Sequence, residues 1–289
     1  MYFLRQFSRI MYYLDMRINL SDNTSIPQVG VGTWTLRGDV AVESVRTALE
    51  MGFRLVDTAQ WYENEAEVGK GIALSGVPRE EIFLTTKVIP SMMRNSAEEI
   101  SRSIEVSLKK LGTGYIDMVL IHWPVMDHLE KTWKVLEEFV AAGKIRSLGV
   151  SNFNPHHLED LFRFAKVRPV LNQIEIHPYL VQEDLVAYSR SAGMQVQAWG
   201  TFGQGNMDIT GDPLLQELAA SYGKTASQIV LRWCVQRGLV VIPRARIHHL
   251  QENLDVMGFE LSDEDMARIS ALDRNLRSSE DNDPETFTY

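Results

Sequence analysis

The chain has 289 residues, 45% hydrophobic and 23% charged, so it is an ordinary globular chain that is long enough for one large core or two small ones. Its formal net charge of −9 opposes binding to phosphate backbones, and we expect no nucleic-acid partner. It contains no run of about 18 apolar residues, which predicts no transmembrane helix and no membrane partner.

The first sixteen residues, MYFLRQFSRIMYYLDM, are aromatic and lightly basic. They lack the continuous apolar stretch and the small-residue cleavage site of a targeting peptide. Because Met11 and Met16 follow closely, we interpret residues 1–16 as an N-terminal extension that is disordered or precedes the true start. Residues 17–289 are then one domain, with a polar, acidic tail after about residue 274.

Eight short apolar runs rich in β-forming residues recur along the chain, each bounded by turn or cap residues. In chain order they are PQVGVGTW, FRLVDTA, IFLTTKV, YIDMVLIHW, IRSLGVSN, VLNQIEIH, MQVQAWG and LVVIP. Nearly all are separated by one segment of helical period, at a spacing of about thirty residues, which is typical of a closed (β/α)8 barrel. An open doubly wound sheet would carry G-x-G-x-x-G after its first strand, and GVGTWT supplies only the first two glycines. We therefore predict an α/β fold, a single-domain (β/α)8 TIM barrel.

The segments between these runs carry helical signals. One apolar stripe is formed by Ile100, Ile104, Leu108 and Leu111. Helix starts are marked by the capping-box pairs Asn64 with Glu67, Ser96 with Glu99 and Thr225 with Gln228, and by Asn154 before Pro155. The single cysteine, Cys234, lies in the helical pattern ASQIVLRWCVQRG, which indicates an inert core thiol and fits a reducing, cytoplasmic location.

Polar residues gather at the carboxyl ends of the predicted strands, where a barrel of this kind has its active site. They are Trp34, Asp57, Lys87, His122, Ser151, Asn152, Gln173, Glu175, Trp199 and Arg244. Each alone has a structural explanation: Asp57 could cap the next helix, and His122 could be a satisfied core histidine. Together, at one rim, they predict a functional site.

The residue types indicate acid–base chemistry. The unperturbed pKa of a tyrosine, near 10, is too high for efficient proton transfer at neutral pH. An ammonium group of Lys87 about 4 Å from the Tyr62 oxygen would favour the phenolate by about 4 kcal/mol at an effective dielectric near 20, or roughly three pKa units. Asp57 would keep Lys87 ionised and oriented, and His122 would donate to, or orient, the oxygen that Tyr62 protonates. This set predicts a general acid acting on a carbonyl that becomes an alkoxide.

The group that attacks the carbonyl is less visible in the sequence. No Ser-His-Asp order, Cys-His pairing or activated serine motif is apparent, which argues against acyl transfer. A hydride donor would be a cofactor. The loops WGTFGQGN and IPRARIHH, after the seventh and eighth strands, are glycine-rich and basic, which favours phosphate binding.

Seven stretches on successive strands then resemble the aldo-keto reductase superfamily, from about residue 17 to about residue 273: GVGTW, DTAQWYENEAEVG, LTTKV, LIHWP, GVSNFN, NQIEIHPYL and VIPRA…ENL. The resemblance implies an NAD(P)H-dependent carbonyl reductase whose catalytic tetrad is Asp57, Tyr62, Lys87 and His122. It assigns the nicotinamide to Ser151, Asn152, Gln173 and Trp199, and the substrate pocket to Trp34, Trp61 and Trp123. It assigns the rest of the cofactor site to Gly32, Thr33, Gly200, Thr201, Arg244, Arg246, His249, Glu252 and Asn253.

The cofactor loops depart from the family pattern in two places. Many relatives carry Ser-Pro-Leu after the aromatic residue that ends the seventh strand, whereas here Gly-Thr-Phe follows Trp199. Relatives that prefer NADPH often have Pro-Lys-Ser and a later arginine, whereas here Arg-Ala-Arg follows Pro243 and His249 takes the later position. Two arginines still favour a 2′-phosphate, so we expect NADPH, with NADH or dual use left open.

Within the superfamily, DTAQWYENEAEVGKGIALSGVPREE and WPVMDHLEKTW look most like prokaryotic 2,5-diketogluconate and methylglyoxal reductases. Short loops would leave the site open to small aldehydes, dicarbonyls or keto-sugars. One alternative is a hydrolase or lyase that uses Glu175 as a base, or a metal held by His122, Glu175 and His177. Another is a non-catalytic nucleotide-binding barrel, because a fold does not dictate activity. We expect a monomeric enzyme with a small-molecule carbonyl substrate and no metal.

Overall fold

A computed structural model describes residues 16–288 of the chain. The interpretation of the first sixteen residues therefore falls, except for Met16, outside the described residues. Within the described range, no helix combines the length and the apolar character needed to cross a bilayer.

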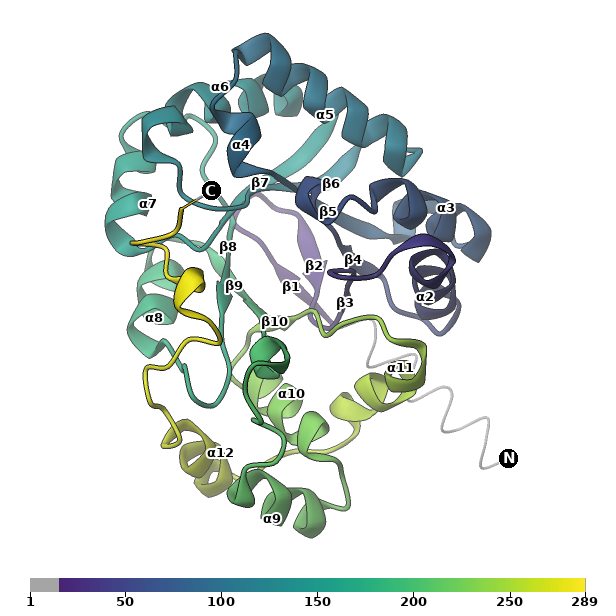
Figure 1. Ribbon diagram of the computed structural model, residues 1–289, viewed down its shortest axis with the longest axis vertical. Helices are drawn as coiled ribbons and strands as arrows, with labels where there is room; N and C mark the ends of the chain where they lie inside the picture. The colour runs from purple at the N-terminus through teal and green to yellow at the C-terminus, as the bar shows by residue number, and fades with distance from the viewer. Residues whose placement is uncertain (1–15, 289) are drawn as a thin grey trace.

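Eight parallel strands form the centre of the molecule (Figure 1). They are β3 (Val31–Gly32), β4 (Leu55–Asp57), β5 (Phe83–Val88), β6 (Ile116–Ile121), β7 (Ile145–Ser151), β8 (Leu171–Glu175), β9 (Gln195–Trp199) and β10 (Val240–Val241). Each strand pairs with its neighbour in chain order. Parallel bridges join Val29 to Val241 and Gly32 to Arg244, so the first and last strands meet and the barrel closes. The predicted (β/α)8 barrel is confirmed, because each of the eight runs supplies its strand in the expected order.

Helices surround this barrel (Figure 1). They are α2 (Gly38–Glu50), α3 (Glu65–Ser75), α4 (Pro90–Met93), α5 (Ala97–Leu111), α6 (Met126–Ala141), α7 (Pro155–Phe162), α8 (Glu183–Ser191), α9 (Pro213–Tyr222), α10 (Ala226–Gln236), α11 (Ile247–Leu254) and α12 (Asp263–Ser270). The predicted apolar stripe of α5 is buried along its whole length. The buried Cys234 lies on α10, where burial raises the pKa of its thiol to about 12, so the thiol stays protonated, as expected for an inert core residue.

A short hairpin that the sequence did not predict closes the opposite end of the barrel from the polar strand ends. Strand β1 (Arg17–Asn19) pairs antiparallel with β2 (Ser25–Pro27), and Figure 1 shows both across the centre of the barrel. Leu20 and Ile26 are buried in one apolar cluster with barrel residues such as Leu55 and Met118. This end of the barrel is therefore closed by hydrophobic packing.

The helix starts agree with the sequence except at Asn64. Capping boxes are present at Ser96 and at Thr225, and Asn154 precedes Pro155 as expected. The capping box predicted for Asn64 with Glu67 is wrong, because the Asn64 side chain makes no hydrogen bond to the start of α3.

The Asn64 amide is fully buried and bonds to neighbouring loops instead. It donates to the backbone oxygens of Thr33 and Leu36 at 2.9 and 3.0 Å and accepts a hydrogen bond from the Thr58 hydroxyl at 2.7 Å. A buried amide needs partners on all its polar atoms, and here the loops satisfy that need better than the helix start does. Asn64 thus ties the loop that follows β3 to the turn that follows β4.

Candidate active site

Four polar side chains meet at the carboxyl ends of three neighbouring strands. Asp57 ends β4, Lys87 lies near the end of β5, and His122 directly follows β6. Tyr62 lies in a short 3-10 helix, η1 (Gln60–Tyr62), which follows β4. Because these strands are parallel and in register, their ends reach the same rim, and the structure brings the predicted tetrad together there.

Lys87 is the centre of this group. Its ammonium nitrogen lies 2.5 Å from Asp57 Oδ1, 3.0 Å from the Thr58 backbone oxygen and 3.2 Å from the Tyr62 hydroxyl oxygen. The side chain is fully buried, and these three contacts use all three of its donors. Since Tyr62 accepts a hydrogen bond from Lys87, its own hydroxyl hydrogen remains available to another acceptor.

The electrostatics keep Lys87 charged and Tyr62 protonated. Burial opposes the charged form of Lys87, but Asp57 and Tyr62 hold its pKa above the ordinary value. For Tyr62, burial raises the pKa and the attraction of Lys87 lowers it only in part. The expected net lowering of the Tyr62 pKa by Lys87 is therefore wrong, because the cost of burying a phenolate is larger. Tyr62 carries its proton at neutral pH.

His122 completes the group as a neutral ring. Burial and then the charge of Lys87 lower the pKa of His122 well below 6.5. Its Nδ1 atom is buried without a hydrogen-bond partner. The ring lies edge-on to Tyr62, with centroids 5.7 Å apart, and to Trp61, at 5.6 Å. A neutral imidazole in this position offers one N–H donor without adding positive charge beside Lys87.

A hydrogen-bond chain joins the tetrad to the ends of the next strands. The Gln173 amide donates to Asp57 Oδ2 at 2.8 Å, and the Ser151 hydroxyl donates to the Gln173 backbone oxygen at 2.9 Å. The Asn152 amide donates to Ser151 at 3.1 Å, and the Trp199 indole donates to Asn152 at 2.9 Å. The predicted nicotinamide residues are thus contiguous with the predicted acid–base residues.

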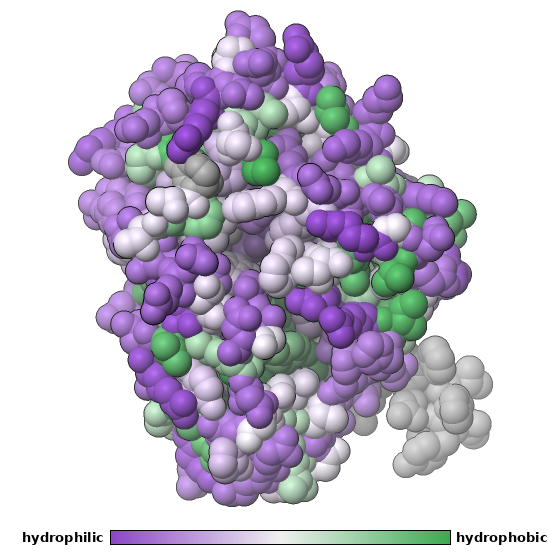
Figure 2. Space-filling model, in the orientation of Figure 1, coloured by the Kyte–Doolittle hydropathy of each residue, from purple (hydrophilic) through white to green (hydrophobic). Residues whose placement is uncertain are grey.

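A cavity of about 540 Å³ opens above these residues. Figure 2 shows this face hollowed near its centre, with residues of intermediate hydropathy around the hollow. The predicted site residues that line the cavity are Gly32, Trp34, Asp57, Trp61, Tyr62, His122, Trp123, Ser151, Asn152, Gln173, Trp199, Gly200, Thr201, Arg244, Arg246, His249, Glu252 and Asn253. Two predicted residues lie behind this wall. Lys87 is buried against Tyr62, and the Thr33 hydroxyl donates to the Asp57 backbone oxygen at 3.0 Å.

The basic part of the wall fits a phosphorylated nucleotide. Arg244 is half-buried and stacks over Trp34 at 5.3 Å, whereas Arg246 is exposed. Burial, and then the charge of Arg246, lower the pKa of Arg244. Across residues 16–288, neither guanidinium forms an ion pair with a carboxylate, so both remain available to a bound anion. Guanidinium groups bind phosphate through paired hydrogen bonds, which makes this wall suitable for a dinucleotide.

Part of the cavity wall was not among the predicted site residues, although five of its residues lie in the two loops predicted to bind phosphate. The additional lining residues are Phe202, Gln204, Gly205, Ser227, Ile242, Pro243, Asn282 and Phe287. Phe287 is the most informative, because its ring is parallel to Trp123 with centroids 3.9 Å apart and lies edge-on to Trp61 at 6.0 Å. The segment interpreted only as a polar, acidic tail therefore contributes an aromatic wall to the cavity, beside two of the residues predicted to bind the substrate.

Several contacts hold this tail against the barrel. The Ser278 backbone N–H donates to Glu175 Oε1 at 2.8 Å, and the Asn206 amide donates to the Ser278 backbone oxygen at 3.0 Å. Farther along, the Glu285 carboxylate accepts a hydrogen bond from the Asn154 amide at the start of α7. Figure 1 shows the segment leaving α12 and running past α8 towards α7. Each contact joins residues far apart in sequence, so local patterns gave no signal for it.

The metal alternative does not assemble at the rim. Glu175 and His177 are fully buried beneath the tail, with Oε1 and Nε2 3.3 Å apart, and His122 does not join them. Over residues 16–288, the one group of three potential ligand side chains close enough to hold an ion is His156, His157 and Glu285. That group contains none of the residues expected to act as a base or to hold a metal.

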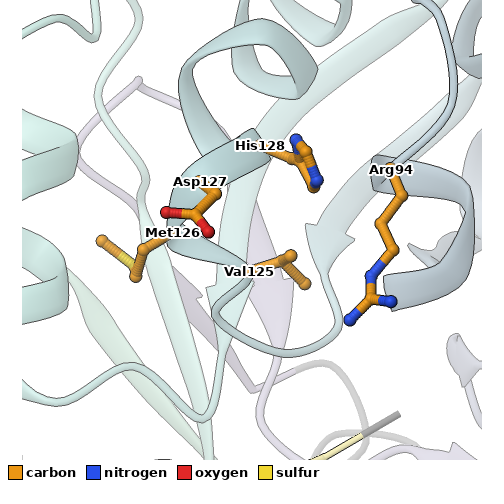
Figure 3. Close-up of a pocket in the computed structure, with 5 residues that line it drawn as sticks. All are labelled: Arg94, Val125, Met126, Asp127 and His128. Atoms are coloured by element: carbon orange, nitrogen blue, oxygen red, sulfur yellow. The ribbon is translucent and has the colours of Figure 1, made fainter.

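A second cavity, of about 300 Å³, lies away from the tetrad. Arg94 extends into it from the end of α4, and residues 125–128 line it from the start of α6 (Figure 3). None of the tetrad side chains reaches this space. The larger cavity is therefore the candidate active site.

A half-buried tyrosine backed by a buried lysine at the mouth of a (β/α)8 barrel, beside a basic wall suited to a nucleotide, is the arrangement expected of a barrel oxidoreductase. Comparison with known protein families gives the particular group. The chain belongs to the aldo/keto reductase family, whose model matches residues 28–274.

Individual relatives agree with this assignment. A glyoxal reductase of Bacillus subtilis is 41% identical over 262 residues, which cover 90% of this chain and 94% of that protein. The methylglyoxal reductase DkgA of Escherichia coli K12 is 39% identical over 269 residues, covering 92% and 96%. The crystal structure of an aldo/keto reductase from Brucella melitensis superposes with a TM-score of 0.84 at 39% identity, covering 89% of this chain and 99% of that one.

The resemblance predicted from the sequence is therefore confirmed, including its likeness to prokaryotic methylglyoxal reductases. The protein is an enzyme of a family that reduces carbonyl groups. Members of this family use nicotinamide cofactors, generally NADPH.

Proposed function

We propose that the protein transfers a hydride from NAD(P)H to small aldehydes, dicarbonyls or keto-sugars, with Tyr62 as the general acid. The observation that carries this proposal is the contact between the Lys87 ammonium and the Tyr62 hydroxyl oxygen, at 3.2 Å beneath the cavity. It leaves a protonated phenol at the cavity wall with a buried positive charge directly behind its oxygen.

The side chains divide the proton chemistry among them. When bound, the nicotinamide supplies the hydride. Tyr62 donates its proton to the carbonyl oxygen as negative charge develops there, and Lys87 stabilises the phenolate that remains. Asp57 holds Lys87 in place and charged, through the contact of 2.5 Å. His122, held neutral by burial, gives a second hydrogen bond to the same oxygen.

The substrate class follows from the walls of the cavity. Trp34 and Trp61 are each about two-fifths exposed, at 40% and 42%, whereas Trp123 is buried beneath Phe287. The space beside Tyr62 therefore has flat aromatic sides and an open mouth. Such a site favours compact carbonyl compounds whose polar ends remain in water.

We further propose that NADPH is preferred. Arg244 and Arg246 supply two guanidinium groups without carboxylate partners in the described chain, as a 2′-phosphate requires. Arg246→Ala should weaken NADPH binding about tenfold or more, and should change NADH binding by less than about twofold. An equal loss for both cofactors in fluorescence titrations would contradict this preference.

The direct test mixes the protein with NADPH or NADH and a panel of aldehydes, dicarbonyls and keto-sugars, and follows the loss of absorbance of the reduced nicotinamide. Oxidation that depends on the added carbonyl is the expected result. Tight cofactor binding without oxidation of any carbonyl would instead identify a non-catalytic nucleotide-binding barrel.

The remaining expectations concern the state of the protein in the cell. We propose a monomer in the cytoplasm, and the buried Cys234 thiol supports a reducing compartment because it has no cysteine with which to form an intrachain disulfide. Light scattering on the purified enzyme tests the first part, since a mass near twice 32.9 kDa would contradict a monomer.

A further inference from the structure

A second glutamine lies inside the barrel directly behind the predicted nicotinamide residues. Gln197 is in the middle of β9 and is paired in register with Gln173 of β8. It is fully buried, in a layer of the barrel that apolar side chains normally fill. Its Nε2 atom has no hydrogen-bond partner in the described structure. An unpaired buried amide is destabilising, so its presence requires an explanation.

The other end of the Gln197 amide makes one contact. Its Oε1 accepts a hydrogen bond from the Gln173 amide nitrogen at 2.7 Å, and the same nitrogen donates its second hydrogen to Asp57 Oδ2 at 2.8 Å. Both amide hydrogens of Gln173 therefore point into the barrel. Its side-chain oxygen is the polar atom left over for the cavity that Gln173 lines.

We propose that Gln197 is a positioning residue that fixes the orientation of the Gln173 amide. With Oε1 of Gln197 on one side and Asp57 on the other, a flipped Gln173 would place its oxygen against two acceptors. Gln173 is thereby held with its oxygen towards the carboxamide of a bound nicotinamide and its nitrogen on the carboxylate that holds Lys87. This inference rests on the proposed function, because it assigns a nicotinamide to this side of the cavity.

The unpaired Nε2 atom of Gln197 fits this role. A leucine or methionine would fill the same layer of the barrel without an unpaired donor, so packing alone does not account for glutamine here. The acceptor oxygen Oε1 of Gln197 is the atom that holds Gln173, and the unpaired Nε2 group is a destabilising consequence of using a glutamine at this position. Gln197 touches neither the cavity nor Tyr62 in the described contacts, so it acts only through Gln173.

The test compares two substitutions of similar length. Gln197→Met removes the acceptor and keeps the volume, whereas Gln197→Glu keeps a carbonyl oxygen, since a carboxyl buried in this position stays protonated. Each variant is titrated with NADPH and with 2′,5′-ADP, which carries the adenine end and lacks the nicotinamide. Gln197→Met should bind NADPH about three- to tenfold more weakly and 2′,5′-ADP as tightly as the wild type does. Gln197→Glu should restore NADPH binding to within about twofold.

The 2′,5′-ADP titration separates positioning from general damage, because a distorted barrel would weaken both ligands. Unchanged NADPH binding in Gln197→Met, or equal weakening of both ligands, would overturn the proposal. If Gln197→Met does not fold, Gln197→Thr serves the same purpose, since threonine suits a strand and is too short to reach Gln173. If the wild-type protein binds NADPH and reduces carbonyls, and the Gln197 variants bind NADPH as tightly as it does, then only the positioning role of Gln197 is rejected. Wild-type protein that binds no nicotinamide nucleotide would reject the proposed function.

Discussion

The two ends of the barrel each bury a carboxylate, and the surroundings of the two differ. At the closed end, Asp117 accepts hydrogen bonds from Arg79 at 2.7 Å, Arg146 at 3.0 Å and the Leu84 backbone N–H at 3.0 Å. Both arginines stack on Tyr115, at 4.2 and 3.8 Å, and both remain partly exposed. Both carboxylate oxygens of Asp117 are therefore hydrogen-bonded, which is the arrangement expected of a cluster that stabilises the fold.

At the open end, Asp57 pairs with a lysine that is itself fully buried, and the surrounding polar groups are only partly satisfied. Buried atoms there that lack a hydrogen-bond partner include His122 Nδ1 beside the cavity and, behind it, His177 Nδ1 and Gln197 Nε2. Incomplete pairing is what a site needs if it is to offer hydrogen bonds to a ligand. The comparison therefore predicts that changes at the open end affect chemistry first and that changes at the closed end affect stability first.

The largest expected effect is that of Tyr62→Phe. It removes the proton donor and should lower kcat by about 10² to 10⁴-fold, while the affinity for NADPH stays near that of the wild type. The matched control is Tyr115→Phe at the closed end, which should keep wild-type turnover. Both are measured by steady-state kinetics with fluorescence titration of the cofactor. Wild-type rates in Tyr62→Phe would mean that the acid lies elsewhere.

The two buried carboxylates provide the second test. Asp57→Asn leaves the Lys87 ammonium buried without a counter-charge and should cost about 3–5 kcal/mol of the free energy of unfolding, together with most of the turnover. Asp117→Asn should cost about 2 kcal/mol, because its arginines can reach water, and should leave kcat/KM unchanged. Urea denaturation and steady-state kinetics measure the two quantities. A large kinetic defect in Asp117→Asn would remove the distinction between the ends.

The pH dependence of stability should also originate at the open end. In the folded protein the pKa of His122 lies well below 6.5. As the pH falls through about 6.5, the unfolded chain therefore binds a proton at His122 that the folded chain does not bind. The stability is fully present above about pH 6.5 and decreases below it, by up to about 1.4 kcal/mol per pH unit for one such group. His122→Gln should reduce this slope in a series of urea denaturations. Part of the slope should remain, because burial also lowers the pKa of His157. Asp117→Asn should keep the slope, and identical slopes in His122→Gln and wild type would contradict the assignment.

The smallest effect is expected for Ile26→Val in the closing hairpin. Ile26 is fully buried, and the loss of one methylene should cost about 1 kcal/mol. In a chain of this size, that corresponds to a decrease in Tm of about 2–4 °C. The kcat should not change, since the hairpin lies at the other end of the barrel from Tyr62. A change in kcat would show that packing at the closed end is coupled to the site.

The sequence predicted the barrel and the tetrad because both depend on local patterns. Each strand is an apolar run with its own turn signals, and Asp57, Lys87 and His122 lie at or near strand ends, so parallel pairing alone brings them to one rim. The partners of Asn64 were not predictable in this way, because a capping pattern says nothing about loops that pack on the helix start.

The largest omission was the tail. Glu175 and Ser278 are 103 residues apart in sequence, and no periodicity connects them. Composition described the segment correctly as polar and acidic, yet one phenylalanine within it, Phe287, lines the cavity and packs on Trp123. The net pKa shift of Tyr62 was missed for a related reason, since the depth of burial is a property of the whole fold.

The position of Phe287 also affects how the protein can be handled in the laboratory. Its ring packs on Trp123 and lines the cavity. A substitution or a fluorescent label introduced next to Phe287 would therefore lie at the wall of the candidate active-site cavity and report on what enters it.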